Sequence, residues 1–445
     1  MTSPHRTLAV AALALACGTN TPKATPAPEP EDVEVRSEMK AREKTVPVQD
    51  PATAMWPEDA KASWPRRCLL ENIATHPTQP WLAAACTDSE GERGAVLVFD
   101  VDRGTLRTAT AFDDMVGWSD AGLLRWHPDG TRLATNVSTN GIAVLQRARY
   151  VGRAHPDDTR DGGVQYVWVG DRLFADTGAF FEIRQGDTRF DFDELDAPAF
   201  QGLAWNTTIS AAVGRVDTGI AAYDPVRQAV VYDHALDDEP RGHLHWSGDG
   251  RWCARRTFAV PPAPDALALF SGDEGTLRAQ VKLSCPRIDK LDWGPAGALA
   301  VRCHDYDPKT RERSTYHLDV IRDGALAQTI DLGSRKIEPS HSVPEAAGLA
   351  WSPTSDGLAL LLEGQQLQIL DAHRGTVVST FHAPAPAIPK GLPSYYTGGH
   401  RAKLGFPGDL IWASPQRLVR IAPHFISVWS IDGEKIAEFV VSDAK

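Results

Sequence analysis

The chain has 445 residues and a net charge of −12, from 46 basic and 58 acidic side chains. No block or stripe of Lys and Arg stands out, so the electrostatic footprint of nucleic-acid binding is missing. Helix-type periodicity is scarce, whereas 36 glycines and 32 prolines supply many turns. Composition therefore favours an all-β protein and excludes nucleic acid as a partner.

Residues 1–16 are predicted to be a signal peptide. Arg6 precedes an apolar run over residues 8–16, which ends in small side chains. This run is too short to span a bilayer of about 30 Å, but it has the length of a signal-peptide core. No later stretch has the length of a membrane helix, so we expect the remainder to be exported and soluble.

Cys17 follows the tripeptide Ala14-Leu15-Ala16, and this junction resembles the lipobox of bacterial lipoproteins. The resemblance implies cleavage before Cys17 and acylation of its sulfur. Ala14 stands where leucine is usual, and an ordinary signal peptidase would instead leave Cys17 as a free thiol. We expect the lipoprotein, because residues 17–60 are rich in Pro, Ala, Glu and Lys and are predicted to be a disordered tether. Such a tether spans about 35 Å.

Residues 61–445 repeat one pattern in eight units. A short apolar segment ends in Trp, a turn of Pro, Gly and Asp follows, and three further strands complete the unit. Turns such as HPDG and SGDG supply the positive φ angles that tight reversals need. Four strands per unit predict the blades of a β-propeller. The anchors of the units are Thr75, Trp126, Trp168, Trp205, Trp246, Trp293, Trp351 and Trp412.

Units such as LLRWHPDGTRLATNV and GLAWSPTSDGLALLL make this region resemble WD-repeat and Tol-system-type propellers. The Gly-His and Trp-Asp dipeptides of true WD repeats are largely missing, so the match is to a divergent member. The resemblance implies a single propeller over residues 61–445. A spacing of about 48 residues favours eight blades, and seven blades of about 54 residues are the alternative, reached by omitting the weak unit around Trp168.

Two pairs of cysteines have the same spacing. Cys68 and Cys86 bracket one Trp-turn hairpin, and Cys285 and Cys303 bracket another. Antiparallel neighbours lie within reach of a disulfide, and export to an oxidising compartment permits the bonds. We therefore predict both disulfides, the alternative being two coincidental pairs of core cysteines. Cys253 has no counterpart and is predicted to be a buried core residue.

Motifs with a known catalytic mechanism are missing from the sequence. We therefore expect no enzymatic activity, no cofactor and no metal. Asp191, Asp193 and Asp196 are close enough to consider calcium, but the segment lacks the glycine of an EF-hand loop and alternates like an amphipathic strand. His243 and His245 share one strand face, where a metal is conceivable, but an innermost strand lining the channel is the favoured interpretation.

A long loop over residues 382–409 separates the last two units. It carries Tyr395, Tyr396, His400 and Arg401, residue types that are enriched in binding surfaces. It is our candidate interaction loop, although a loop that merely packs against the last blade fits equally well.

The functional hypothesis is a non-enzymatic protein-interaction platform in the bacterial cell envelope. Its partners would be unidentified envelope proteins, and it would contact the membrane through the lipid anchor alone. Propellers often serve this way, which is an argument from fold. The alternative is a propeller enzyme, or a binder of a sugar or small metabolite, with its site in the central channel. A scaffold without a ligand is a third possibility.

Overall fold

The chain divides into an N-terminal unit, Met1–Thr53, and a larger unit, Ala54–Lys445, which holds all the described strands. The predicted signal peptide, Cys17 and most of the predicted tether lie outside the described residues. No helix in the described part of the chain is long and apolar enough to cross a membrane. The computed structural model describes residues 56, 62–65, 67–88, 93–113, 124–137, 141–146, 149–154, 165–176, 179–181, 192–194, 197–216, 219–236, 242–257, 263–306, 313–336, 348–362, 365–386 and 410–441.

The described strands form eight four-stranded antiparallel sheets, each built from four consecutive strands. Sheet 1 contains β1 (Leu69–Thr75), β2 (Trp81–Thr87), β3 (Gly94–Asp100) and β4 (Thr105–Phe112), and sheet 2 contains β5 (Leu124–Trp126), β6 (Arg132–Val137), β7 (Gly141–Gln146) and β8 (Arg149–Ala154). Sheet 3 contains β9 (Tyr166–Val169), β10 (Arg172–Ala175), β11 (Ala179–Phe181) and β12 (Phe192–Glu194), and sheet 4 contains β13 (Gln201–Asn206), β14 (Ala211–Val216), β15 (Gly219–Asp224) and β16 (Ala229–Ala235).

The second half of the larger unit repeats the arrangement. Sheet 5 contains β17 (Gly242–Trp246), β18 (Trp252–Thr257), β19 (Ala266–Ser271) and β20 (Leu277–Val281), and sheet 6 contains β21 (Arg287–Trp293), β22 (Leu299–Tyr306), β23 (Arg313–Arg322) and β24 (Ala325–Lys336). Sheet 7 contains β25 (Leu349–Trp351), β26 (Gly357–Leu361), β27 (Gln366–Asp371) and β28 (Thr376–His382), and sheet 8 contains β29 (Leu410–Ser414), β30 (Arg417–Ala422), β31 (Phe425–Ser430) and β32 (Lys435–Val440).

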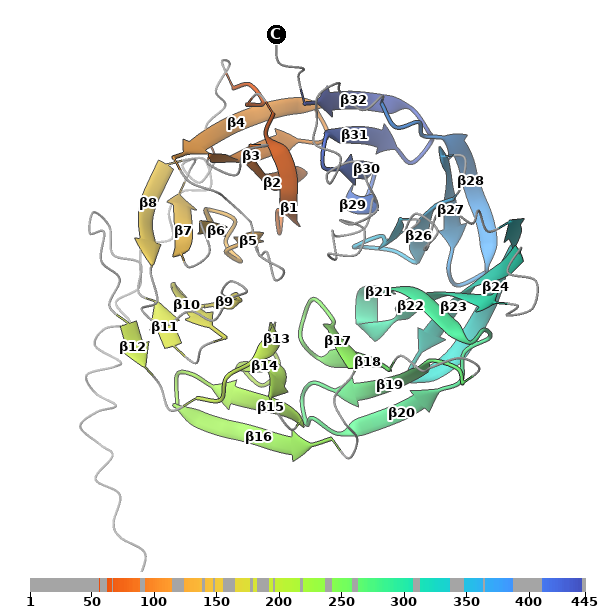
Figure 1. Ribbon diagram of the computed structural model, residues 1–445, viewed down its shortest axis with the longest axis horizontal. Coiled ribbons are helices and arrows are strands. Elements are labelled where there is room, and N and C mark those ends of the chain that lie inside the picture. The colour runs from red at the N-terminus through yellow and green to blue at the C-terminus, as the bar shows by residue number, and fades with distance from the viewer. Residues whose placement is uncertain are drawn as a thin grey trace, which may run out of the picture. The chain divides into compact units, whose positions relative to one another are not determined.

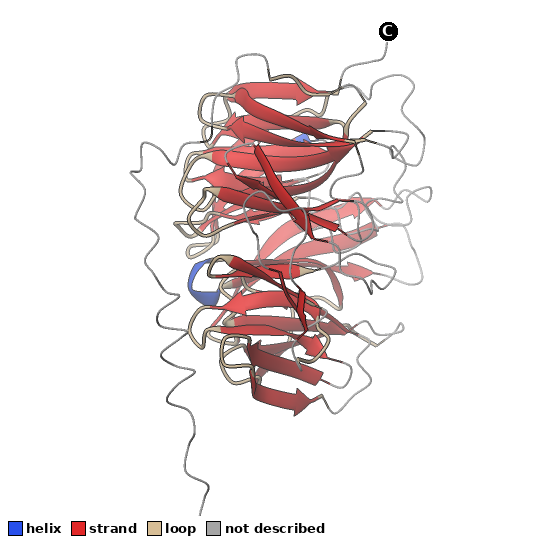
Figure 2. Ribbon diagram, turned by 90° about the vertical axis from the view of Figure 1, so that its left-hand side faces the viewer, coloured by secondary structure: helices blue, strands red, loops and turns tan. Residues whose placement is uncertain are grey.

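The sheets follow one another around a ring, with the first strand of each sheet nearest the centre and the fourth at the perimeter (Figure 1). Seen from the side, they form a single ring of sheets (Figure 2). The larger unit is thus an all-β propeller, and each of the eight sequence units supplies one sheet. Strands such as β2 and β3 are buried along their whole length because neighbouring sheets cover both of their faces.

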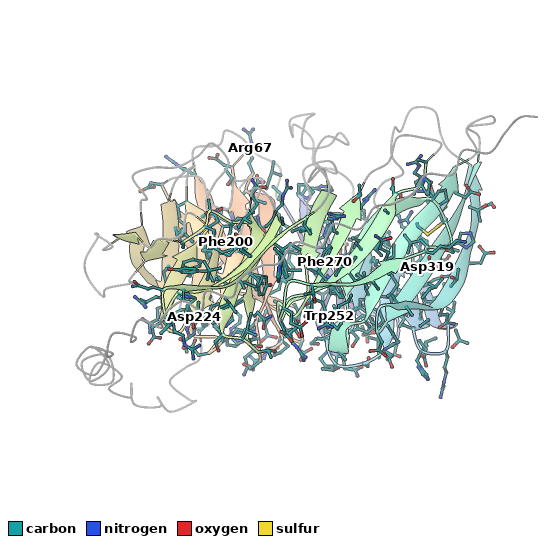
Figure 3. The ribbon with its side chains drawn as sticks, turned by 90° about the horizontal axis from the view of Figure 1, so that it is seen from below. Arg67, Phe200, Asp224, Trp252, Phe270 and Asp319 are labelled. Atoms are coloured by element: carbon teal, nitrogen blue, oxygen red, sulfur yellow. A yellow bond between two sulfur atoms is a disulfide. The ribbon has the colours of Figure 1, made fainter. Side chains whose placement is uncertain are left out.

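The ring has two faces, which differ in their connections. The first strand of a sheet ends, and the second begins, at the same edge of the ring as the end of the third strand and the start of the fourth. Figure 3 places Asp224 and Trp252, which are the strand residues next to the turns between these strands, at one edge of the ring and Arg67 at the other. Antiparallel four-stranded sheets impose this division, because alternate connections must emerge at opposite ends.

Four of the tryptophans at the ends of the inner strands tie their own sheet to the preceding one. An innermost strand is an edge strand with unpaired carbonyl groups, and an indole has one N–H to donate. The indole nitrogen therefore donates to a carbonyl of the neighbouring inner strand. The ladder comprises Trp126 to Ala74 (3.2 Å), Trp168 to Arg125 (3.2 Å), Trp293 to His245 (2.9 Å) and Trp351 to Asp292 (3.0 Å).

The perimeter strands share a β-bulge near their start. In seven of the eight sheets described, one extra residue follows the turn from the third strand, as the pairing register shows. A bulge twists an edge strand and hinders its pairing with another chain. The extra residues are Arg107, Val151, Val231, Arg278, Ala327, Val378 and Ile436.

The ring closes where sheet 8 meets sheet 1, without any exchange of strands. Sheet 1 is made of the first four strands and sheet 8 of the last four, so side-chain packing must hold the junction. One continuous apolar cluster runs from β1–β3 to β30 and β31. The amide of Leu70 also donates to the carbonyl of Pro423 at 2.8 Å, and Arg417 pairs with Asp102 at 3.2 Å.

Both predicted disulfides are present. Cys68 and Cys86 are bonded with their Cα atoms 5.2 Å apart, and Cys285 and Cys303 with theirs 5.8 Å apart. The first bond lies within the cluster that closes the ring. Cys253 is a buried free thiol, which confirms its placement in the core. The sequence reasoning about all five cysteines of the propeller is thus confirmed.

Trp56 extends the propeller beyond the boundary expected from the sequence. The Pro-rich composition placed this residue inside the tether, with the propeller starting at residue 61. In the structure its side chain is 0% exposed and packs into the apolar cluster between sheets 1 and 2. Composition alone could not reveal this, because a single anchoring side chain leaves no period in the sequence.

Candidate functional site

His243 and His245 lie on β17, the innermost strand of sheet 5, as the favoured interpretation predicted. The imidazole of His245 is exposed, while its carbonyl accepts the indole N–H of Trp293. Within the described ranges, no group of three or more His, Cys, Asp or Glu side chains is arranged to hold a metal ion. Both histidines therefore belong to the strand of sheet 5 that lies nearest the centre of the ring.

The other residues singled out in the sequence fall largely outside the described residues. This is true of the candidate interaction loop residues Tyr395, Tyr396, His400 and Arg401, and of Asp191 and Asp196. Asp193 belongs to β12, the perimeter strand of sheet 3, which confirms a strand at this point of the carboxylate-rich segment.

Asp292, on the inner strand β21, is a half-buried carboxyl that links two sheets. Burial raises its pKa to about 6, and the hydrogen bond that it accepts from the amide of Trp351 and the charge of Lys290 only partly oppose this shift. The Trp351 amide lies 2.8 Å from its Oδ2, so the side chain joins β21 to β25. A raised pKa is typical of catalytic acids. Here, however, the carboxyl is engaged by a backbone amide, which makes it part of the inter-sheet ladder.

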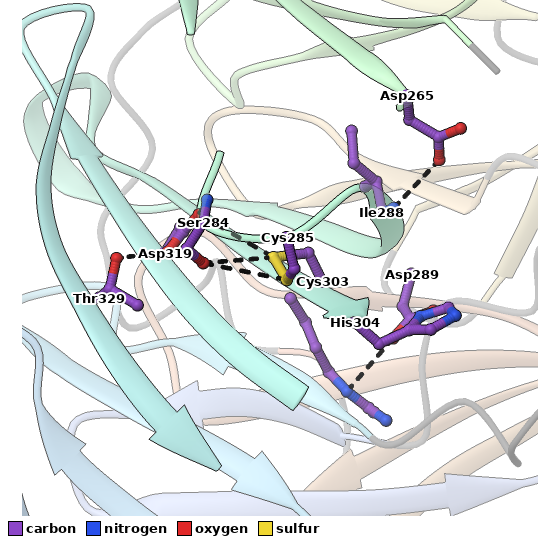
Figure 4. Close-up of a disulfide and its surroundings, with 10 residues drawn as sticks. Asp265, Ser284, Cys285, Ile288, Asp289, Cys303, His304, Asp319 and Thr329 are labelled. Carbon is purple, nitrogen blue, oxygen red and sulfur yellow. Dashed lines mark hydrogen bonds and ion pairs between the residues drawn. A yellow bond between two sulfur atoms is a disulfide. The ribbon is translucent and has the colours of Figure 1, made fainter. Parts of the chain in front are cut away.

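A network of charges lies beside the second disulfide, at the junction of sheets 5 and 6 (Figure 4). Asp265 pairs with Arg287 at 3.0 Å and with Arg256 at 3.6 Å. Asp289 accepts a hydrogen bond from His304 at 2.8 Å and lies 3.7 Å from Arg302. Each carboxylate thus has at least two cationic or potentially cationic neighbours. Such an arrangement fixes both side chains in ion pairs and hydrogen bonds, which suits a structural junction better than general acid–base catalysis.

Asp319 occupies the other side of that disulfide (Figure 4). It is fully buried and accepts the Ser284 amide at 2.7 Å and the Thr329 hydroxyl at 2.7 Å. These bonds satisfy the carboxylate and fasten the residue before Cys285 onto β23 and β24. The region around the disulfide is therefore a structural junction with its polar groups engaged.

An apolar belt follows the perimeter of sheets 4 to 7. Every large hydrophobic side chain that is exposed in the described part of the chain lies on the perimeter strands β16, β20, β24 and β28 or in the turn before β16, with exposures from 40% to 67%. Because these side chains recur near the start of the fourth strand in four successive sheets, a partner that spans this part of the perimeter would meet several apolar contacts. The belt consists of Val226, Val230, Val231, Leu277, Leu326, Val377 and Val378.

A pocket of about 410 Å³ lies between the perimeter of sheet 6 and sheet 7, and Val377 is the one belt residue that lines it. Its volume falls in the range of small-molecule and side-chain binding sites. Apolar side chains and two glutamine amides face it, and Val377 joins it to the belt. The lining residues are Ile330, Asp331, Leu332, Leu362, Gln366, Gln368, Leu370 and Val377.

Sequence reasoning missed the belt for an identifiable reason. Valines after a turn, as in RGTVVST, read as buried strand positions, because strand patterns distinguish faces but not inner strands from perimeter strands. One property of the sequence could have revealed the belt. The valine pairs 230–231 and 377–378 stand at the start of the fourth strand of their units, where the bulge lies.

No protein-family model matches the chain, and no curated protein matches its sequence. Among solved structures, hydrazine synthase from Kuenenia stuttgartiensis shares 13% identity, with a TM-score of 0.45 over 85% of this chain and 100% of that one. The C-terminal WD40 domain of Sif2 shares 10% (TM-score 0.41, 86% and 90% covered), and the computationally designed Ika8 protein shares 9% (0.48, 84% and 96%). The chain is thus structurally similar to WD40 propellers, and these similarities carry no argument about function.

Proposed function

We propose that this protein is a non-enzymatic protein-interaction platform, exported and tethered to a bacterial membrane through Cys17. The observation that carries the proposal is the apolar belt on sheets 4 to 7 with its pocket of about 410 Å³. Burying a valine or leucine contributes about 1.5–3 kcal/mol, so covering several of these half-exposed side chains favours a bound partner. The bulges hinder strand pairing at this edge, so the partner would contact side chains.

The proposal predicts that charges in the belt abolish partner capture. Val231→Lys with Val378→Lys alters two exposed bulge residues, which leaves the core intact. Each lysine opposes burial by a partner, because an unpaired buried charge is costly. We expect crosslinking in envelope fractions to recover a specific protein with the natural chain and at least about tenfold less with the double variant.

The matched control is Thr105→Lys, an exposed position on the perimeter strand β4 outside the belt. It should capture the partner as efficiently as the natural chain. Equal capture by the belt variant, or recovery of a glycan or metabolite in place of a protein, would contradict the proposal.

The tether is a separate prediction, tested at Cys17. Replacing it with alanine removes the sulfur to which a lipid would attach, so the protein should move from the membrane fraction to the soluble fraction. Cys253→Ala, which removes a buried cysteine of the propeller, is the control and should stay with the membrane. The two disulfides support export, since such bonds persist in oxidising compartments. Membrane retention of the Cys17 variant would rule out a lipid at this residue.

A further inference from the structure

Trp56 fills a cleft between sheets 1 and 2. Its ring meets that of Trp126 edge to face, with the centroids 5.0 Å apart, and the same apolar cluster includes Trp81. Buried side chains of β3 and of the inner strands of sheet 2 complete the lining. A tryptophan in such a setting buries more apolar area than any other side chain would, and edge-to-face contacts add to its stabilisation.

The backbone of Trp56 is held as well as its ring. Its carbonyl accepts a hydrogen bond from Nη2 of Arg107 at 2.8 Å, and this guanidinium also pairs with Asp100 at 3.3 Å. The guanidinium carbon lies 4.5 Å from the centre of the Trp81 ring. One arginine thus recognises the main chain of the segment while a neighbouring aromatic wall receives its indole.

Arg107 departs from the pattern of the other perimeter bulges. It is the extra residue in the bulge of β4, and it is 3% exposed. The corresponding residues Val231, Arg278, Ala327 and Val378 are exposed to solvent. In sheet 1 the β-bulge therefore directs the side chain of Arg107 inward, where it donates a hydrogen bond to the Trp56 carbonyl.

We propose that the cleft between sheets 1 and 2 is a tryptophan-binding site, which the chain fills with its own Trp56. The ligand it fits is a tryptophan residue whose indole enters the cleft while its backbone carbonyl faces an arginine. Trp56 is the first described residue of the propeller unit, which begins at Ala54, so its docking anchors the start of that unit. The site is independent of the proposed tether and of the belt.

The indole N–H of Trp56 is buried without a hydrogen-bond acceptor in the described residues. Apolar contacts therefore hold the indole ring, and the hydrogen bond from Arg107 holds the backbone carbonyl of Trp56. Phenylalanine should therefore fill only part of the cleft, whereas alanine should empty it.

Limited trypsin digestion of the full chain tests the site, because Lys61 lies between Trp56 and Trp64 while Lys44 precedes both. In Trp56→Ala, cleavage after Lys61 should become about tenfold faster, and cleavage after Lys44 should keep its rate. Trp56→Phe should digest at a rate between those of the natural chain and Trp56→Ala. Equal rates after Lys61 in all three proteins would overturn the proposal.

Rescue in trans provides a second readout that does not rely on proteolysis. The peptide DPATAMWPEDA, residues 50–60, should raise the unfolding temperature of Trp56→Ala in proportion to its occupancy, and the same peptide with alanine for tryptophan should not. Trp64→Ala is the matched control, since it removes a tryptophan that packs elsewhere and donates to the Cys68 carbonyl. Rescue of the Trp64 variant, or none of the Trp56 variant, would show that the cleft is not a tryptophan site. Both assays use purified protein without membranes, so their outcome is separate from that of the tether.

Discussion

Removing either disulfide is expected to lower the free energy of unfolding by about 3 kcal/mol, since closing a loop of this length restricts the unfolded chain by that amount. Both bonds close loops of the same sequence separation, 18 residues, so the two losses should be similar. Cys68→Ala with Cys86→Ala acts at the ring closure, and Cys285→Ala with Cys303→Ala acts at the junction of sheets 5 and 6. For a propeller of this size, each loss corresponds to about 4 °C in unfolding temperature.

The measurement is thermal and denaturant unfolding with and without a reductant. The bonds lie in different sheets and share no partner, so the quadruple variant should lose about 6 kcal/mol. Reductant should destabilise the natural chain and leave the quadruple variant unchanged. Cys253→Ala is the control, because it removes a buried thiol without removing a bond. A reductant effect that persists in the quadruple variant would show that these bonds do not account for the stabilisation.

The two cysteine pairs illustrate what the sequence can determine. Their matched spacing around a Trp turn was enough to predict the bonds, because antiparallel geometry converts spacing into proximity. The tryptophans at the ends of inner strands were likewise predicted as unit anchors. That four of them donate the indole N–H to the preceding sheet was not predictable, since this depends on how neighbouring sheets are staggered.

Features that depend on contacts between distant segments escaped the sequence. The contacts of Trp56 with Trp126 and Arg107 require that sheets 1 and 2 are assembled, and no local sequence pattern predicts them. The Asp289–His304 pair arises because β21 is irregular between Ile288 and Lys290, which alters its register against β22. Such features belong to packing and register, which a single sequence specifies only collectively.

Asp292→Asn is expected to stabilise the protein at neutral pH. Burial raises the pKa of this carboxyl from 3.8 to about 6, so the folded state disfavours its charged form. Stability from the protonated carboxyl is fully present below pH 3.8 and is lost as pH rises through about 6. Above that pH the natural chain carries a destabilisation of at most about 3 kcal/mol, the equivalent of this shift. Asparagine is neutral throughout and can still accept the Trp351 amide through its carbonyl oxygen.

The free energy of unfolding of the Asp292→Asn variant, relative to that of the natural chain, should therefore increase as the pH rises. Near pH 4 the variant and the natural chain should unfold at similar denaturant concentrations, and the variant's advantage should grow until about pH 7 and then level off. Asp432→Asn removes one carboxylate at an exposed turn position and is the matched control. A difference that stays constant across this range would mean that the effect of the Asp292→Asn substitution lies in packing. A loss of stability at all pH values would show instead that the ionised carboxylate is needed to hold the Trp351 amide, which would make charge, despite its burial, the feature that joins sheets 6 and 7.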